Sequence, residues 1–298
     1  MKLSAWPHYF WKIPVCGLLF FIGLMPGAQL AGLIGLATPA MPAGADQATI
    51  AQFTMLASLI LALGLAFVSR GLPGKFLLRW LILFFFTWIA YAVNNYFEAA
   101  IFSTMSAASL YAVVVFLPGS LLCSAGVAWL FPPKIQNANF IDQVRTFFEG
   151  RSLAGWAWRF LSAFMAFPLA YYLFGSLIAP IVLPYYQQGV SELALPGWNQ
   201  ILPVLAIRSV LFLLACLPII IAWNLPKRSL FVTLGIALFI LVGGISMLEA
   251  YWLLPVLRVT QTLEIFADEM VYAGTLTLLL GRPMTQPADK RVLVGAEA

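Results

Sequence analysis

The ionisable residues that could do chemistry are concentrated in the last apolar stretch of the chain. Gln261, Glu264, Asp268 and Tyr272 recur at i, i+3, i+7 and i+11, the spacing of one helix face. Glu269 lies about 100° around the helix from Asp268. A charged side chain that faces lipid costs a few kcal/mol or more, so we expect this polar stripe to face neighbouring helices or a water-filled cavity.

Arg208 is the natural counter-ion for these acids. It lies about two turns inside the apolar stretch 201–223, where an unpaired guanidinium would be unfavourable. Because arginine can bind a carboxylate through two parallel hydrogen bonds, we expect Arg208 to pair with Asp268 or Glu264, and with Glu249 as the next choice.

Two further acids lie near the same side of the membrane. Glu98 and Glu249 each end an apolar stretch, and Asn94 and Asn95 precede Glu98 by about one turn. The acids therefore outnumber Arg208, and carboxylates crowded at low dielectric favour the uptake of protons or cations. The excess predicts a site for a cation, a cationic solute or a coupling proton. The alternative is that Arg208 and one or two acids only hold helices together, while Glu98 and Glu249 are hydrated at the membrane surface.

The composition requires elements that cross a membrane. The chain has 298 residues, of which 62% are hydrophobic and 9% charged, with mean hydropathy +0.95. Soluble domains carry about 25% charged residues, which excludes a water-soluble enzyme, a disordered protein and a nucleic-acid binder. The fold class is therefore an all-α polytopic membrane protein. About eight stretches are long enough to span the bilayer as helices, namely 12–36, 50–70, 76–102, 106–131, 155–183, 201–223, 229–252 and 259–281.

The basic residues predict the topology of these spans. All Lys and Arg residues except Arg208 and Arg258 fall on one side when both termini are cytoplasmic. The net charge of +5 is then a positive-inside bias. We expect a multi-pass protein of the plasma (inner) membrane with both termini in the cytoplasm.

The two halves of the chain resemble each other in order. Short matches recur at a nearly constant offset, pairing 11–12 with 158–159, 71–75 with 224–228, and 96–99 with 247–250. We therefore predict two parallel four-helix repeats, 1–132 and 155–281, although matches this short also arise by chance in biased sequence. The cytoplasmic connector 133–154 contains an amphipathic pattern over 139–149, typical of a helix on the inner leaflet or of a docking surface. The polar tail 282–298 is expected to be disordered.

The remaining residue types exclude several chemistries. His8 is the single histidine and precedes the first apolar stretch, which excludes bis-histidine haem and histidine-rich zinc sites. The sequence has neither a Gly-x-Ser-x-Gly motif nor a phosphate-binding Gly-Lys-Ser/Thr motif. Cys16, Cys123 and Cys216 fall in separate apolar stretches and are predicted to be core residues. We predict no cofactor, no metal site and no catalytic residue.

These features favour a transporter or solute-binding permease over an enzyme, with an outward-facing acidic site for a cation, a proton or a cationic solute. The alternative is a non-catalytic membrane subunit of a larger complex. A third hypothesis, an intramembrane lipid-modifying enzyme, would require a lateral opening lined by the acids. The expected partners are the lipid bilayer, a small cation or cationic solute and, for the subunit hypothesis, another membrane protein; nucleic acid is not among them.

Overall fold

The computed structural model describes residues 10–281 apart from 43, 103–105, 134–138 and 191–192. The predicted disordered tail 282–298 lies outside the described residues. The described chain is all-α, and seven of its helical segments are long and apolar enough to cross a membrane. They are α2 (Lys12–Leu33), α3 (Gln47–Gly71), Phe76–Phe102, Leu110–Leu130 within α6 (Ser106–Leu130), α8 (Leu153–Gln187), α9 (Trp198–Ala222) and Lys227–Glu249. The chain is therefore a multi-pass membrane protein that associates with the lipid bilayer, as predicted.

The eighth predicted span is present as helix α12 (Pro255–Leu280) but differs in composition from the other seven. It has 26 residues, enough to cross the hydrocarbon layer, and it carries Arg258, Glu264, Asp268 and Glu269. It packs against α8 and against α10 (Lys227–Phe239). Its buried residues include Asp268, Glu269 and Tyr272, so part of its polar face is enclosed by protein.

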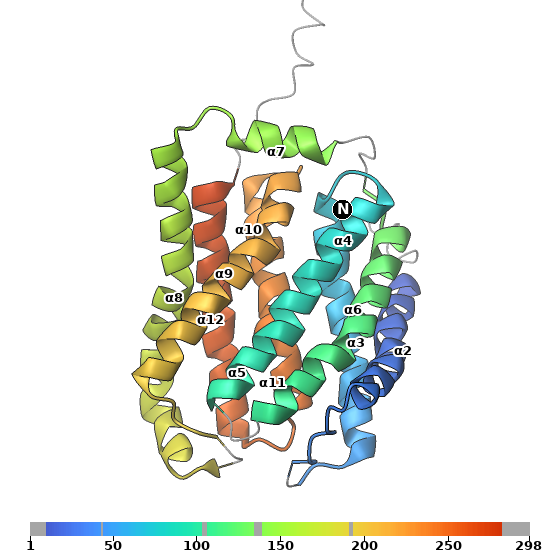
Figure 1. Cartoon of the computed structure of the whole chain (residues 1–298), viewed down its shortest axis with the longest axis vertical. Helices are drawn as coiled ribbons and strands as arrows, with labels where there is room; N and C mark the ends of the chain where they lie inside the picture. Colours follow the sequence, from blue (N-terminus) through green and yellow to red (C-terminus); the bar gives the residue numbers. More distant parts are fainter. Residues whose placement is uncertain (1–9, 43, 103–105, 134–138, 191–192, 282–298) are drawn as a thin grey trace, which may run out of the picture.

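Each half of the chain packs its helices mainly against one another (Figure 1). In the first half α2 packs against α3 and α6, and in the second half α8 packs against α9 and α12. Between the halves α4 (Phe76–Thr87) contacts α9, and α10 contacts α3. Two hydrogen bonds also join the halves. Asn95 Nδ2 donates to Ser246 Oγ at 3.1 Å, and Asn224 N donates to Gly71 O at 3.2 Å.

Small residues on the first span bring α2 and α6 into direct backbone contact. A Cβ atom added to Gly23 would lie 2.5 Å from the Cα of Gly119, and one added to Gly27 would lie 2.1 Å from the carbonyl oxygen of Val115. Ala31, one turn later, is fully buried. Small residues allow this approach, and side-chain packing leaves no space between these two helices.

Two π-helical turns interrupt the third and seventh spans. They are η2 (Trp88–Val93), followed by α5 (Asn94–Phe102), and η4 (Ile240–Gly244), followed by α11 (Ile245–Glu249). Neither turn contains proline, whereas the helices run continuously through Pro26, Pro118, Pro168 and Pro218. The described helices therefore do not break at these prolines. The extra residue in each π-helical turn instead rotates the polar residues that follow it.

Basic side chains stabilise the bundle end where α6 terminates. Lys12 Nζ donates to Leu130 O at 2.9 Å, and buried Arg79 donates to Ala128 O at 2.8 Å and to Phe131 O at 2.6 Å. These carbonyls have no partner within the helix, and cations are favourable beside a helix C-terminus.

The amphipathic segment of the connector forms helix α7 (Phe140–Phe148), which lies across this end of the bundle (Figure 1). Asn139 caps it by accepting a hydrogen bond from Ile141 N at 3.1 Å. Phe147 is buried and its ring lies 4.7 Å from that of Trp156 at the start of α8, whereas Ile141 is exposed. One apolar face of α7 thus packs on the bundle, and Ile141 remains open to the surroundings.

Candidate functional site

A cavity of about 580 Å³ lies among α5, α8, α9 and α12. Its lining extends to Leu193, Leu195 and Pro196 in the loop before α9 and to Leu253 in the loop before α12. These loops lie at the end of the bundle opposite α7 (Figure 1). The volume is within the range of small-molecule binding sites, about 300–1,000 Å³.

Arg208 pairs with Glu98 and Asn94. Its Nη2 atom donates to Glu98 Oε1, and its Nε atom donates to Asn94 Oδ1 at 2.8 Å. The expectation that Asp268 or Glu264 would be its ion-pair partner is therefore wrong. The π-helical turn η2 directly precedes Asn94 and turns this face of α5 toward α9, a rotation that the sequence periodicity did not reveal.

Aromatic rings complete the surroundings of the arginine. Its guanidinium carbon lies 4.9 Å from the ring centre of Phe167 and 5.8 Å from those of Tyr171 and Phe212. Arg208 is 2% exposed, and its Nη1 atom has no hydrogen-bond partner among the described residues. The guanidinium is held in place by one carboxylate, one amide and three aromatic rings.

The three acids of α12 all line the cavity, and none of them forms a salt bridge with an arginine or lysine of the described chain. Asp268 is 5% exposed and Glu269 is 1% exposed. Asp268 Oδ1 and Glu269 Oε2 are both buried and have no hydrogen-bond partner among the described residues. Burial of an unpaired carboxylate is costly, so these side chains are kept at the expense of stability.

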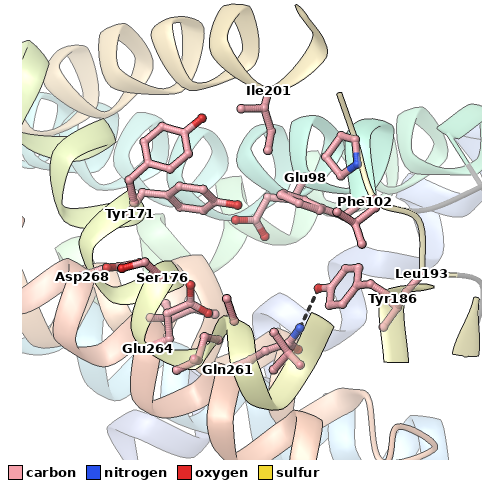
Figure 2. Close-up of a pocket in the computed structure, with 18 of the residues that line it drawn as sticks. Glu98, Phe102, Tyr171, Ser176, Tyr186, Leu193, Ile201, Gln261, Glu264 and Asp268 are labelled. Carbon is pink, nitrogen blue, oxygen red and sulfur yellow. Dashed lines mark hydrogen bonds between the residues drawn. The ribbon is translucent and has the colours of Figure 1, made fainter. Parts of the chain in front are cut away.

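Glu264 faces Glu98 across the cavity. Figure 2 shows their carboxyl groups directed into the same space, with the Tyr171 ring beside them. Gly175 of α8 makes room for Glu264, since a Cβ atom at this position would lie 3.2 Å from Glu264 Oε1. The cavity therefore has four carboxylates and one guanidinium in its lining, and its charge excess is negative.

The other two predicted polar residues of α12, Gln261 and Tyr272, lie in different surroundings. Gln261 lines the cavity and donates through Nε2 to the Tyr186 hydroxyl of α8 at 2.8 Å (Figure 2). Tyr272 is fully buried and packs with its ring 5.6 Å from Phe167 and 6.2 Å from Phe212. It supports the rings around Arg208 and is not among the cavity residues.

Glu249 and Asn95 lie apart from the cavity, between the two halves. Glu249 Oε2 accepts a hydrogen bond from the Tyr91 hydroxyl at 3.0 Å, and Thr54 also hydrogen-bonds to this carboxyl. Asn95 donates to Ser246. The single acidic region expected from the sequence is thus two regions, with Glu98, Glu264, Asp268 and Glu269 in the cavity and Glu249 elsewhere.

Sequence reasoning missed the wall that α8 contributes. The helix has 35 residues and extends to Gln187, beyond the predicted end of this span at 183. Its extension carries Tyr186, and its middle carries Tyr171, Tyr172 and Gly175, all of which line the cavity. The pair of tyrosines inside an apolar stretch was the available signal, because a buried tyrosine needs a partner for its hydroxyl.

Comparisons with known proteins add no assignment to this geometry. No protein-family model, curated protein or solved structure matches the chain.

Proposed function

We propose that the protein is a membrane transporter or solute-binding permease whose cavity binds a cation, a proton or a cationic solute. The observation that carries the proposal is the pair of buried, unpartnered carboxylate oxygens of Asp268 and Glu269 in the wall of a cavity. An ionisable residue inside a membrane protein is costly and is retained at sites of ion or substrate passage. Helices held together only by polar contacts would need no such cavity, which favours this function over a purely structural subunit.

The test is a flux measurement in proteoliposomes. Three cationic probes are used: the sodium ion, the proton and 4-phenylbutylammonium. Vesicles containing the purified protein are expected to take up at least one of them faster than protein-free vesicles. Asp268→Asn should abolish that difference. Uptake that is equal in wild-type, variant and protein-free vesicles for all three probes would contradict the proposal. Tight copurification with a stoichiometric foreign membrane protein would then favour the subunit hypothesis.

We further propose that α12 is the eighth span and that the chain consists of two parallel four-helix repeats. The two π-helical turns, the matching helix pairs and the hydrogen bonds Asn95–Ser246 and Gly71–Asn224 support this, because residues at equivalent places meet where a pseudo-two-fold axis would pass. The repeats differ at the site. In the alignment that pairs Glu98 with Glu249, the first half has Ala57 opposite Arg208, Val113 opposite Glu264 and Leu117 opposite Asp268.

The proposed orientation places α7 and both termini in the cytoplasm of a cell whose plasma (inner) membrane holds the protein. The basic residues Lys12, Lys75, Arg79, Lys227 and Arg228 lie at the α7 end of the described helices, as the positive-inside rule requires. The end of the cavity lined by Leu193, Leu195, Pro196 and Leu253 then faces the exterior.

Cysteine labelling checks this orientation. Ile141→Cys on α7 and Met41→Cys in the loop before α3 each introduce a thiol at an exposed position, 74% and 52% accessible. Native Cys16, Cys123 and Cys216 are buried, so background labelling is expected to be low. A membrane-impermeant maleimide should label Met41→Cys in intact cells and Ile141→Cys only after permeabilisation. The reverse pattern would invert the topology.

A further inference from the structure

We propose that the cavity binds an amphipathic organic cation, an ammonium group attached to an apolar body. This inference rests on the proposed function and names the substrate class of the same site. The cavity combines two chemistries that such a ligand also combines: carboxylates that outnumber its one arginine, and an extensive apolar wall.

The acidic part lies deep and the apolar part reaches the mouth. Helix α12 runs inward from its first residue at the loop end, so Asp268 and Glu269 lie about 10 Å deeper than Gln261. Apolar residues line the space from the loops inward, namely Phe102, Ile178, Val182, Leu183, Leu195 and Ile201. A ligand would therefore insert its ammonium group first and leave its apolar body toward the mouth.

Aromatic rings favour a cation that has lost its water. Phe102 contacts the rings of Tyr171 and Tyr186, with centres 6.5 and 6.3 Å apart, and Tyr172 contacts Trp198 at 5.4 Å. All five side chains line the cavity. Ammonium groups bind to aromatic faces with a free energy that grows as the site is desolvated, and apolar bodies pack against the same rings.

The spacing of the acids fits an organic cation better than a divalent metal ion. Calcium requires six to eight oxygen ligands around one point. Within the described residues, no three His, Cys, Asp or Glu side chains converge closely enough to hold a metal ion. Glu98, Glu264 and Asp268 instead lie at different places around the cavity (Figure 2).

Entry from the aqueous phase follows from the lining. Leu193, Leu195, Pro196 and Leu253 belong to loops at the end of the bundle, so the mouth adjoins the membrane surface rather than the hydrocarbon centre. The proposed ligand is therefore a water-soluble amine.

Three probes test separately whether binding requires the ammonium charge and the apolar body. Their affinities are measured at equilibrium with the purified full-length protein. 4-Phenylbutylammonium has both the charge and the body, 4-phenylbutanol has the body alone, and methylammonium has the charge alone. We expect 4-phenylbutylammonium to bind at least about tenfold more tightly than either of the others, because each partial ligand leaves one part of the site unsatisfied.

A cavity-filling variant locates the binding. Gly175→Leu adds a side chain against Glu264 in the cavity wall and should weaken 4-phenylbutylammonium binding at least about tenfold. Gly32→Leu is the matched control, because Gly32 lies on the exposed face of α2 with nothing within 4 Å of an added Cβ. Unchanged melting temperature in both variants shows that the fold is retained.

The outcomes distinguish this inference from the proposed function. If sodium or calcium binds in a manner that requires Asp268 while 4-phenylbutylammonium binds no better than methylammonium, the organic-cation class is overturned and the cation site stands. If no cation of either kind distinguishes wild-type from Asp268→Asn, both proposals fail. Equal binding of 4-phenylbutylammonium to wild-type and Gly175→Leu would also overturn the inference, because the ligand would then lie outside this cavity.

Discussion

Asp268→Asn is expected to weaken cation binding at least about tenfold while leaving the melting temperature equal to or above that of wild-type. Hydrogen bonds to charged groups contribute about 1.5–3 kcal/mol, which corresponds to roughly a 10- to 100-fold change in affinity. The stability effect has the opposite sign because Asp268 is 5% exposed and its Oδ1 atom has no hydrogen-bond partner among the described residues, so the substitution removes the cost of burying that carboxylate. Binding assays and thermal unfolding on the same detergent-solubilised sample measure both effects.

The matched control is Asp142→Asn. Asp142 is exposed on α7 at the other end of the bundle, and the substitution makes the same chemical change. It should leave cation affinity unchanged. A fall in melting temperature for Asp268→Asn with no loss of binding would show that Asp268 is a structural residue and would remove it from the site.

Arg208→Met is expected to destabilise the protein by about 3–5 kcal/mol, the usual cost of removing one partner from a buried ion pair. Arg208 is 2% exposed, and its loss leaves Glu98 beside the other cavity carboxylates without its cation. In the fraction that remains folded, cation binding should be retained or strengthened, since the cavity becomes more negative. Thermal unfolding measures the loss of stability, and titration with the cationic probe measures the change in affinity.

A double-mutant cycle with Glu98→Gln separates pairing from packing. If the ion pair dominates, Arg208→Met/Glu98→Gln will be more stable than Arg208→Met alone, because both charges are then absent. Additive losses would instead assign the effect to the packing of the arginine against Phe167, Tyr171 and Phe212. Loss of cation binding in Arg208→Met, measured on folded protein, would contradict its assignment as counter-ion to Glu98.

Much of the fold could be predicted because a membrane limits the choices. Apolar length predicted the spans directly, and seven of the eight predicted stretches meet the criteria of a candidate membrane span. The π-helical turns could not be predicted, because their apolar residues Trp88–Val93 and Ile240–Gly244 fit an ordinary helix equally well. If the two spans are treated as ordinary α-helices, the directions predicted for the Glu98 and Glu249 side chains are wrong. This explains why the sequence did not predict Glu98 as the partner of Arg208.

Part of the candidate site could also be predicted, from the helical periodicity of its polar residues. The periodicity of α12 identified Gln261, Glu264 and Asp268 as one face, and all three line the cavity. Glu269 lines it too, although it lies on a different face, because the wall of the cavity wraps around α12. The contribution of α8 depends on how two helices far apart in sequence are spaced, and no local pattern records that spacing.

The most direct test of the central claim is difference infrared spectroscopy of the carboxyl groups in purified, reconstituted protein during addition of 4-phenylbutylammonium, sodium ion or proton. The bands of protonated and ionised carboxyl groups report whether buried acids respond to the added cation. We predict a change in these bands in wild-type protein that is lost in Asp268→Asn/Glu269→Gln and preserved in Asp142→Asn. Identical difference spectra in wild-type and the double variant would contradict the claim that these two carboxylates bind the cation.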